Sequence, residues 1–339
     1  MRIGMAGICA RYWPFALANG VRNRPGTKLS AAAIMGFTEK QIAVHLEMSA
    51  REYADRMGLP LYTQAEEMIE AEKLDCVILC TPQTQHARWV EKLAPLGVDI
   101  FVPKTFATTM RDAQRIVTAA KKYKVRIASG PTGRFLPAIA AARKAVDRGI
   151  IGAPFSFRVM HHHGTIDSFG PQDWYRDEKE GGPELSLGWY VLDLVLHFMG
   201  PKVRDIYAHY DNFTTPDSPF MDCGQMVLTM RSGAIAACNM YFCNRMPYPS
   251  WEIEIAGPKG IIRVQQSGPD AGTTESVFFG PKGRTALPLP KRLPHWEVFW
   301  ADEFRQDKPL SITAANAAWI TELSLAARRS SRTGRPIKL

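Results

Sequence analysis

Lys104 follows a short apolar run in the stretch IFVPKTFATT, residues 100–109, and lies between Pro103 and Thr105. The run predicts a buried strand that ends in a Pro-Lys-Thr corner before a helix. Lysine is among the residues that are least often buried. A lysine held at the end of a strand is therefore either a solvated surface group or a cation that acts on a ligand.

Three consecutive histidines, His161, His162 and His163, end a second strand-like stretch, FSFRVMHHH. On a strand, His161 and His163 share one face and His162 points to the other. The pair could hold a metal with a third ligand or hydrogen-bond a polyol, and a solvated strand end or an aromatic-like patch on a sheet are the alternatives. No carboxylate or cysteine nearby completes a ligand set, so the sequence predicts no metal site.

The first predicted turn from strand to helix reads G-I-C-A-R-Y from Gly7. A full dinucleotide fingerprint has three glycines here, and Cys9 and Tyr12 stand in the second and third places. If the turn binds a dinucleotide, Gly7, Cys9, Ala10 and Arg11 are the residues that contact it.

The second predicted strand does not end in the acid that usually binds the adenosine ribose of NAD. It is followed by Gly36, Phe37, Thr38 and Lys40. A hydroxyl and a lysine suit a 2′-phosphate, so the expected cofactor is NAD or NADP, and this segment favours NADP.

Short apolar runs and helical patterns alternate over the first 130 residues. Strands are expected at 2–8, 28–35, 75–80, 99–102 and 125–129, and helices at 50–58, 86–97 and 109–124. Near-continuous apolar strands that alternate with helices are typical of a parallel sheet covered on both faces. The sequence therefore predicts a Rossmann-like domain at 1–128, with ligands at the carboxyl ends of its strands.

The pattern changes in the second part of the chain, which we assign to a domain at 129–339. Helices are expected at 136–148, 187–200 and 312–331, and strands at 155–163, 224–230, 234–243, 251–257 and 260–266. GPKG at 257–260 is a candidate hairpin turn. The fold class is thus α/β followed by α+β, the second domain having a large, mainly antiparallel sheet.

The composition limits the class of protein. The 339 residues carry a net charge of +9, but the basic residues are interleaved with acids, and no nucleic-acid recognition motif is present. No apolar run approaches the ~20 residues of a membrane-spanning helix. The N-terminus is typical of a first strand and not of a signal peptide, and the six scattered cysteines form no C-x-x-C pair. We expect a cytoplasmic protein with reduced thiols that binds neither nucleic acid nor membrane.

Four segments occur in a familiar order and spacing: CTPQTQHARWV (80–90), VPKTFATT (102–109), GPTGRFLP (130–137) and GGPELSLGWYVLDLVLHFMG (181–200). They resemble the glucose-fructose oxidoreductase / inositol dehydrogenase / MocA family. The resemblance continues through 150–154, 256–264 and 330–339, and so covers essentially the whole chain. It implies an NAD(P)-dependent oxidoreductase that transfers a hydride between nicotinamide and a secondary alcohol or carbonyl of a sugar, cyclitol or related polyol. It also implies a homodimer or homotetramer that associates through the C-terminal sheet.

The resemblance implies a catalytic pair. The Glu-Lys-Pro of the family falls on Pro103, Lys104 and Thr105, where only the lysine is retained. Its Asp-x-Gly-x-His begins at Ser186 and ends at Tyr190, and tyrosine serves as the acid/base in some branches of the family. An ammonium beside a phenol lowers the pKa of the phenol, so such a pair can take a hydroxyl proton and stabilise the alkoxide.

The remaining site residues are carried over from the same resemblance. The expected cofactor contacts are Thr81, Pro82, His86, Pro103, Lys104 and Arg134, and the expected substrate contacts are His161, His163, Trp174, Arg176, Ser186 and Tyr190. His86 as a helix cap and Arg134 as a surface ion pair are the alternatives. Asp193 is expected to tie its helix in place.

Departures from the family pattern at Cys9, Pro103, Thr105 and Ser186 keep a second function open. A homologue that has lost catalysis would act as a cofactor-binding scaffold or sensor. A third possibility is a lyase or hydrolase that holds NAD tightly and cycles it through oxidation and reduction.

Overall fold

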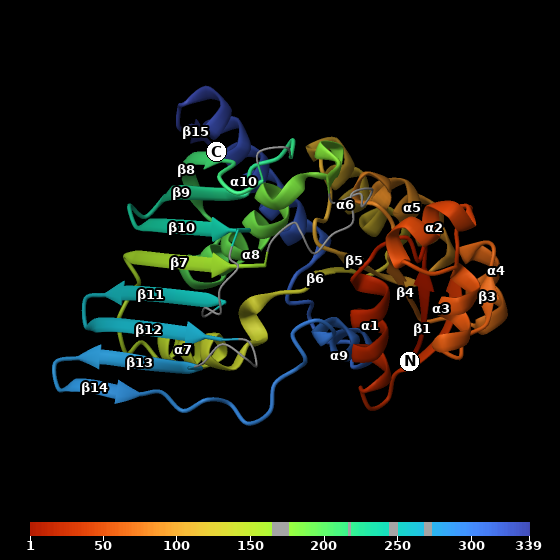
Figure 1. Ribbon diagram of the computed structural model, residues 1–339. Helices are drawn as coiled ribbons and strands as arrows, with labels where there is room; N and C mark the ends of the chain where they lie inside the picture. Colours follow the sequence, from red (N-terminus) through yellow and green to blue (C-terminus); the bar gives the residue numbers. More distant parts are fainter. Residues whose placement is uncertain (165–175, 216–217, 244–249, 268–272) are drawn as a thin grey trace. The chain divides into compact units, whose positions relative to one another are not determined.

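The computed structural model describes residues 1–339 except 165–175, 216–217, 244–249 and 268–272. The chain forms two compact units (Figure 1). Unit 1 comprises 1–131, 169–181 and 297–321, and unit 2 comprises 132–168, 182–296 and 322–339. The chain first passes between them at 131/132, close to the predicted boundary at 128/129. Each unit is discontinuous in sequence, because the chain returns to unit 1 twice.

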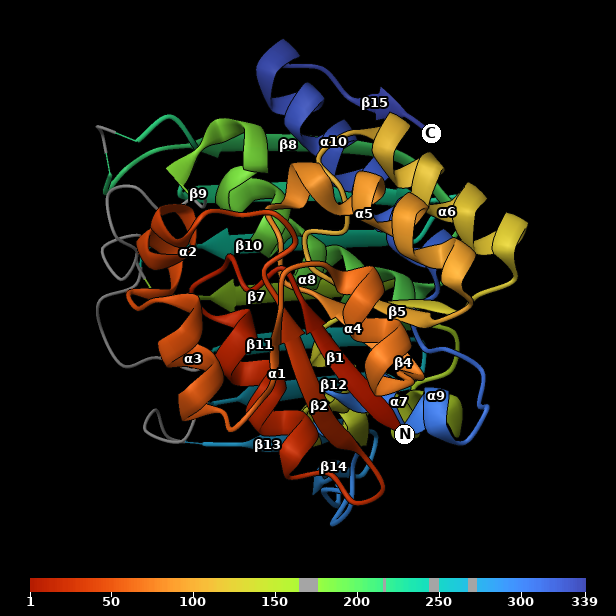
Figure 2. The same ribbon diagram turned by 90° about the vertical axis from the view of Figure 1, so that its right-hand side faces the viewer.

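Unit 1 is built on a six-stranded sheet in the order β3-β2-β1-β4-β5-β6, part of which is visible in Figure 2. The strands are β1 (Arg2–Ala6), β2 (Lys28–Ala33), β3 (Leu61–Tyr62), β4 (Cys76–Leu79), β5 (Asp99–Pro103) and β6 (Ile127–Gly130). Every neighbouring pair is parallel. The order reverses between β1 and β4, which makes the carboxyl ends of those strands the expected ligand site. The predicted Rossmann-like domain is confirmed.

Helices cover this sheet. They are α1 (Trp13–Arg22), α2 (Glu39–Leu46), α3 (Ala50–Arg56), α4 (Ala65–Glu72), α5 (His86–Leu93), α6 (Met110–Tyr123) and α9 (Phe299–Arg305). Side-chain caps fix the start of α2, α3 and α6. Thr38 and Ser49 each form a capping box at the start of α2 and α3. Along α6 the buried residues Ala113, Ile116 and Val117 recur at helical spacing.

Unit 2 contains a nine-stranded sheet in the order β14-β13-β12-β11-β7-β10-β9-β8-β15. The strands are β7 (Ser156–His162), β8 (Val203–Asp211), β9 (Cys223–Met230), β10 (Ile235–Tyr241), β11 (Trp251–Gly257), β12 (Gly260–Gln266), β13 (Glu275–Gly280), β14 (Gly283–Ala286) and β15 (Ile337–Lys338). Only the β7–β10 pair is parallel. Gly257 pairs with Gly260 across the predicted hairpin turn, and the α+β class is confirmed.

One face of this sheet is covered by helices. Helix α7 (Pro137–Asp147) packs on β12 and β13, and α8 (Gly182–Met199) packs on β7 and β10. Helix α10 (Ala314–Thr333) begins in unit 1 and ends in unit 2. The strands alternate accordingly, and along β7 Phe157, Val159 and His161 are the buried positions.

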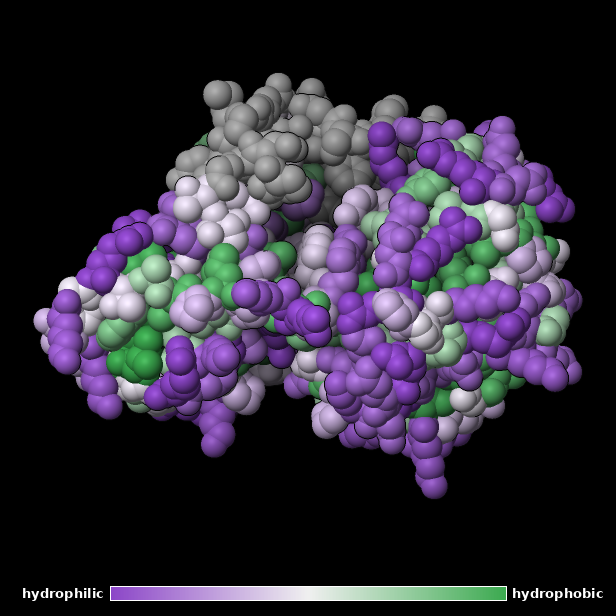
Figure 3. All heavy atoms as spheres, turned by 90° about the horizontal axis from the view of Figure 1, so that it is seen from below, coloured by the Kyte–Doolittle hydropathy of each residue, from purple (hydrophilic) through white to green (hydrophobic). Residues whose placement is uncertain are grey.

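Apolar side chains are exposed on the opposite face of the sheet. Tyr207 pairs with Val227, and Ile261 pairs with Phe279; these four residues are 37–45% exposed. On the surface that Figure 3 shows, hydrophobic residues interrupt the hydrophilic ones in several places. Separately, none of the described helices is both long and apolar enough to cross a membrane.

Candidate active site

The turns that follow β1 and β4 touch each other at Gly7. Gly7 has φ +71°, and its N–H donates to the Ala33 carbonyl at 2.8 Å. A Cβ added at Gly7 would lie 2.3 Å from Cγ2 of Thr81. The Cys9 N–H donates to the Cys80 carbonyl at 2.9 Å. Both the backbone angle and the lack of space therefore require glycine at position 7, and the structure brings the predicted residues Gly7, Cys9 and Thr81 together.

The turn after β2 has a capped helix behind it. Gly36 has φ +77°, with open space where a side chain would be. Thr38 is the N-cap of α2, and its hydroxyl oxygen accepts a hydrogen bond from the Gln41 N–H at 3.2 Å. Arg11 pairs with Glu47 at 2.7 Å. Thr38 and Arg11 thus have structural partners, and their predicted contact with a cofactor stays a prediction.

Lys104 is buried at the carboxyl end of β5. Its N–H donates to the Gly130 carbonyl at 2.6 Å, and Nζ lies 5.8 Å from the centroid of the Trp13 ring. The residue is 8% exposed, and burial lowers the pKa of its amine to about 7. The amine therefore titrates near neutral pH, which is the range in which a proton-transfer group is most effective. Burial therefore excludes the solvated surface group, and the action of the Lys104 amine on a ligand stays a prediction.

Three buried polar atoms at the ends of β4 and β5 lack a hydrogen-bond partner among the described residues. They are Oγ1 of Thr81, Oε1 of Gln83 and Oγ1 of Thr105. Buried polar groups in native proteins are nearly always paired, and leaving one unpaired is costly. A ligand with its own donors and acceptors, such as the nicotinamide riboside part of a dinucleotide, would satisfy them. The residues present therefore fit a nicotinamide cofactor.

His86 connects the same two turns from the start of α5. Its Nδ1 lies 3.1 Å from the Phe106 carbonyl oxygen, and the ring also interacts with the backbones of Thr81 and Thr105. Burial lowers the pKa of His86 to about 4, so the imidazole is neutral at pH 7. This geometry is that of a structural bridge, and a direct contact between His86 and the cofactor stays a prediction.

In unit 2, Tyr190 of α8 belongs to a buried aromatic cluster. Its ring centroid lies 5.2 Å from that of His161 and 5.7 Å from that of Trp251. The rings of His161 and Trp251 stack at 3.8 Å, and these two residues are paired in the β7–β11 register. Nδ1 of His161 lies 2.9 Å from the Ser250 carbonyl, so this nitrogen carries the proton and donates it. The cluster holds the Tyr190 ring from two sides.

The side chains of the histidine run point alternately to the two faces of the sheet, as expected for a strand. The rings of His161 and His163 are 5.9 Å apart, whereas His162 stacks on Tyr241 at 5.0 Å. Among the residues that the structure describes, no group of three or more His, Cys, Asp or Glu side chains is arranged to hold a metal ion.

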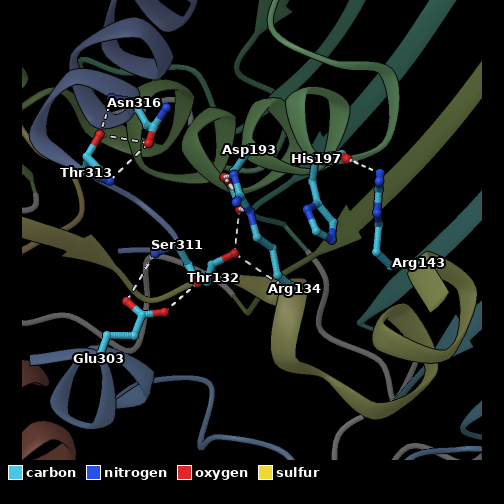
Figure 4. A network of polar contacts seen from close by, with 9 residues as sticks. All are labelled: Thr132, Arg134, Arg143, Asp193, His197, Glu303, Ser311, Thr313 and Asn316. Atoms are coloured by element: carbon cyan, nitrogen blue, oxygen red, sulfur yellow. Dashed lines mark hydrogen bonds and ion pairs between the residues drawn. The ribbon is translucent and has the colours of Figure 1, made fainter. Parts of the chain in front are cut away.

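Asp193 is fully buried on α8 and binds two residues that precede α7 (Figure 4). Nε of Arg134 donates to both carboxylate oxygens at 3.1 Å, and Nη2 donates to Oδ1 at 2.5 Å. The Thr132 hydroxyl also donates to Oδ2. The expectation that Asp193 ties its helix in place is confirmed. Arg134 forms a partly buried ion pair with this carboxylate, and its contact with a cofactor stays a prediction.

We expect Asp193→Ala to lower the free energy of unfolding by about 3–5 kcal/mol, because it removes the fully buried carboxylate that binds both Thr132 and Arg134. Urea unfolding of the full chain measures the change. Asp147→Ala is the matched control, since Asp147 is 53% exposed and pairs with Arg143 on the surface. It should cost less than about 1 kcal/mol. Equal losses in the two variants would contradict the assignment.

The other predicted residues are distributed between the units. Ser186 is buried on α8 in unit 2, whereas Arg176 belongs to unit 1. Trp174 lies outside the described residues. Lys104 belongs to unit 1 and Tyr190 to unit 2, so their pairing stays a prediction.

Three residues of these clusters are absent from the predicted set: Trp13, Gln83 and Trp251. Gln83 directly follows the predicted contact Pro82, and Trp13 follows Arg11 by two residues, so extending each predicted segment by two residues would have included both. The signal for Trp251 is its place on the buried face of an alternating strand, and this pattern does not predict that it stacks on His161.

Taken together, the 3-2-1-4-5-6 sheet with a buried lysine at its edge, and the α+β unit that follows it, define a two-domain dinucleotide-binding protein. Residues 1–130 match the oxidoreductase family with an NAD-binding Rossmann fold, and residues 139–263 match the GFO/IDH/MocA C-terminal domain. The chain belongs to the Gfo/Idh/MocA family of oxidoreductases.

Curated relatives of this family include sugar and cyclitol dehydrogenases. The chain is 30% identical over 207 residues to D-apiose dehydrogenase of Paraburkholderia graminis, which is 60% of this chain and 54% of that protein. It is 24% identical over 307 residues to myo-inositol 2-dehydrogenase of Thermotoga maritima, which is 85% of this chain and 87% of that protein. The matched part thus spans about half the length of the first relative and most of the second.

Solved structures share the fold over the whole chain. An oxidoreductase from Agrobacterium radiobacter, solved in complex with NAD⁺, L-tartaric acid and magnesium, superposes with a TM-score of 0.82. The two sequences are 21% identical, and the match covers 100% of this chain and 98% of the other. At this identity the likeness extends to the fold alone.

Proposed function

We propose that the protein is a nicotinamide-dependent oxidoreductase that acts on a secondary alcohol or carbonyl of a sugar, cyclitol or related polyol. The observation that carries the proposal is the buried amine of Lys104, with a pKa near 7, at the carboxyl edge of a sheet whose strand order is that of dinucleotide-binding domains. Membership of an oxidoreductase family and the names of the two curated dehydrogenases support it.

In this proposal a bound nicotinamide supplies or accepts the hydride. The turn at Gly7 and Cys9 lets the backbone approach the pyrophosphate, and the polar atoms of Thr81, Gln83 and Thr105 pair with the riboside. Tyr190 takes the hydroxyl proton of an alcohol substrate, and the ammonium form of Lys104 stabilises the alkoxide. His161 and His163 bind the substrate hydroxyls. Each role except hydride transfer thus falls on a side chain or backbone of this chain.

The preference that we propose is for NADP. The nearest acid after β2 is Glu39, and its Oε2 accepts the Ala50 N–H at 2.9 Å, so this carboxylate already serves the start of α3. A ribose 2′-hydroxyl therefore lacks its usual carboxylate partner, whereas Lys40 is exposed two residues after Thr38 and suits a 2′-phosphate.

We expect the purified chain to enhance the fluorescence of both NADPH and NADH, with a Kd about tenfold lower for NADPH. A panel of polyols and keto-sugars, each tested with both cofactors, then measures turnover. Absence of binding at millimolar dinucleotide would overturn the proposal. Tight binding with no turnover of any substrate would instead support the scaffold or sensor.

Association through the outer face of the nine-stranded sheet forms a second part of the proposal. The exposed apolar residues Tyr207, Val227, Ile261 and Phe279 on that face would be covered in a homodimer or homotetramer. We also propose a cytoplasmic location, in which the six cysteines stay reduced. Native mass spectrometry of the protein as purified reports both the number of copies and any bound dinucleotide.

A further inference from the structure

A buried carboxylate that is not among the predicted site residues lies against the turn that follows β4. Glu180 ends the 3₁₀ helix η6 (Glu178–Glu180) and is 7% exposed. Its Oε2 accepts the Thr84 N–H at 2.9 Å, and its Oε1 accepts the Thr84 hydroxyl at 2.5 Å. The Gln83 backbone also hydrogen-bonds this carboxylate. Burial raises the pKa of Glu180, and these hydrogen bonds oppose the rise.

These hydrogen bonds supply a cap that the local sequence lacks. The 3₁₀ helix η1 (Gln83–Gln85) runs directly into α5, and Pro82 at its start offers no side-chain cap. Glu180 provides the acceptors from a segment 96 residues further along the chain. A negative charge at the start of a helix is also favourable. Glu180 therefore fixes the backbone that carries Thr81 and Gln83, whose buried polar atoms are assigned to the cofactor.

The chain enters α8 immediately after Glu180. Gly181 and Gly182 have φ +97° and +58°. A Cβ added at Gly182 would lie 2.6 Å from Oε2 of Glu184 and 2.8 Å from Cβ of Phe220, so this bend is restricted to glycine. Glu180 therefore binds the turn assigned to the cofactor from a position two residues before α8 begins. Helix α8 is the one that carries Tyr190, the proposed acid/base.

We propose that Glu180 is a positioning residue of the active site, which holds the turn Thr81–Thr84 in the conformation that binds the cofactor productively. This inference rests on the proposed function. Glu180 touches no reacting atom in this proposal and acts through Thr84 and Gln83. Its loss should therefore impair turnover more than it impairs dinucleotide affinity, because a displaced turn still binds but no longer aligns the cofactor.

The test compares Glu180→Gln with Glu178→Gln in the full chain. Glu178 is exposed on the same 3₁₀ helix, so the control makes the same chemical change two residues away. In Glu180→Gln we expect hydrogen exchange at the Gln83 and Thr84 amides to rise at least tenfold, kcat to fall at least tenfold, and the dinucleotide Kd to change less than threefold. A purely structural role would lower the melting temperature and leave kcat unchanged at 25 °C.

Thr84 variants test the same contact from its other side. Thr84→Val removes the hydroxyl donor and should reproduce part of the loss in kcat, whereas Thr84→Ser keeps the donor and should retain the native kcat. The double variant Glu180→Gln/Thr84→Val should lose less than the product of the two single losses. A kcat within twofold of the native chain in Glu180→Gln overturns the positioning role.

Failure of the proposed function is distinguishable from failure of this inference. If the native chain binds a dinucleotide but turns over no substrate, the proposed oxidoreductase activity fails, and exchange at the Gln83 and Thr84 amides still decides the role of Glu180. Faster exchange in Glu180→Gln than in Glu178→Gln then supports the inference, and equal exchange overturns it.

Discussion

Lys104→Met is expected to lower kcat at least about a thousandfold while leaving the Kd of the dinucleotide within about threefold. The substitution removes the one cation that we assign to the developing alkoxide, and the loss of such a preorganised group typically costs 10²–10³ in rate. It also removes the ammonium that we expect to lower the pKa of the Tyr190 phenol, which slows the proton transfer to that residue. Methionine has a similar length and is apolar, so it suits a site in which Lys104 is 8% exposed. Steady-state kinetics and fluorescence titration give the two numbers.

The pH dependence of Lys104 provides a second readout of the same assignment. Because burial lowers its pKa to about 7, kcat/KM for alcohol oxidation should fall as the pH rises through 7 and the ammonium is lost. Between pH 7 and the ordinary lysine value of 10.5, the unfolded chain binds more protons than the folded one, so the free energy of unfolding rises with pH in that window. Lys104→Met should abolish that rise.

Lys92→Met is the matched control for Lys104. The Lys92 amine also lies over an indole ring, 4.9 Å from that of Trp89, but it is exposed and pairs with Glu66. We expect its kcat to stay within twofold of the native value. Turnover by Lys104→Met at a tenth of the native rate or more would refute a catalytic role for the amine.

The parallel sheet of unit 1 could be predicted because its strands are continuous apolar runs. The range of helix α1 was not predicted, although its buried residues Trp13, Leu17, Ala18 and Val21 recur at helical spacing. Pro14 and Gly20 interrupt the pattern, yet proline is tolerated in the first turn of a helix. Strand β8 alternates buried and exposed residues but is rich in charged ones, and the parallel pairing of β7 with β10 has no local signal.

The residues of the candidate site likewise fall into those that the sequence could predict and those that depend on tertiary packing. Lys104, Gly7 and Thr81 lie at the carboxyl ends of strands that the sequence predicts, so the topology of a parallel sheet places them at one edge. Trp251 stacks on His161 only because β11 pairs with β7 in a particular register, which no periodicity specifies. The contact of Glu180 with Thr84 spans 96 residues and depends on tertiary packing. The sequence could thus predict the site residues at strand ends, whereas their supporting contacts with Trp251 and Glu180 depend on the tertiary fold.

Tyr190→Phe is expected to lower kcat by about 10²–10⁴, the range that general acid–base catalysis supplies. The substitution removes only the hydroxyl, so the ring contacts with His161 and Trp251, at centroid distances of 5.2 and 5.7 Å, are retained. The free energy of unfolding should therefore change by less than about 1.5 kcal/mol, the usual net value of one hydrogen bond. Kinetics and urea unfolding of the same preparation separate the two effects.

Tyr210→Phe makes the same change at a buried tyrosine of β8, where burial raises the pKa of the phenol. This variant should keep kcat within twofold of the native value, since Tyr210 has no part in the proposed chemistry. A Tyr190→Phe variant that retains more than a third of native kcat would exclude Tyr190 as the acid/base, because a phenylalanine ring can neither take nor return a proton. A large loss confined to Tyr190→Phe would instead exclude the scaffold or sensor, for a chain without catalysis has no turnover to lose.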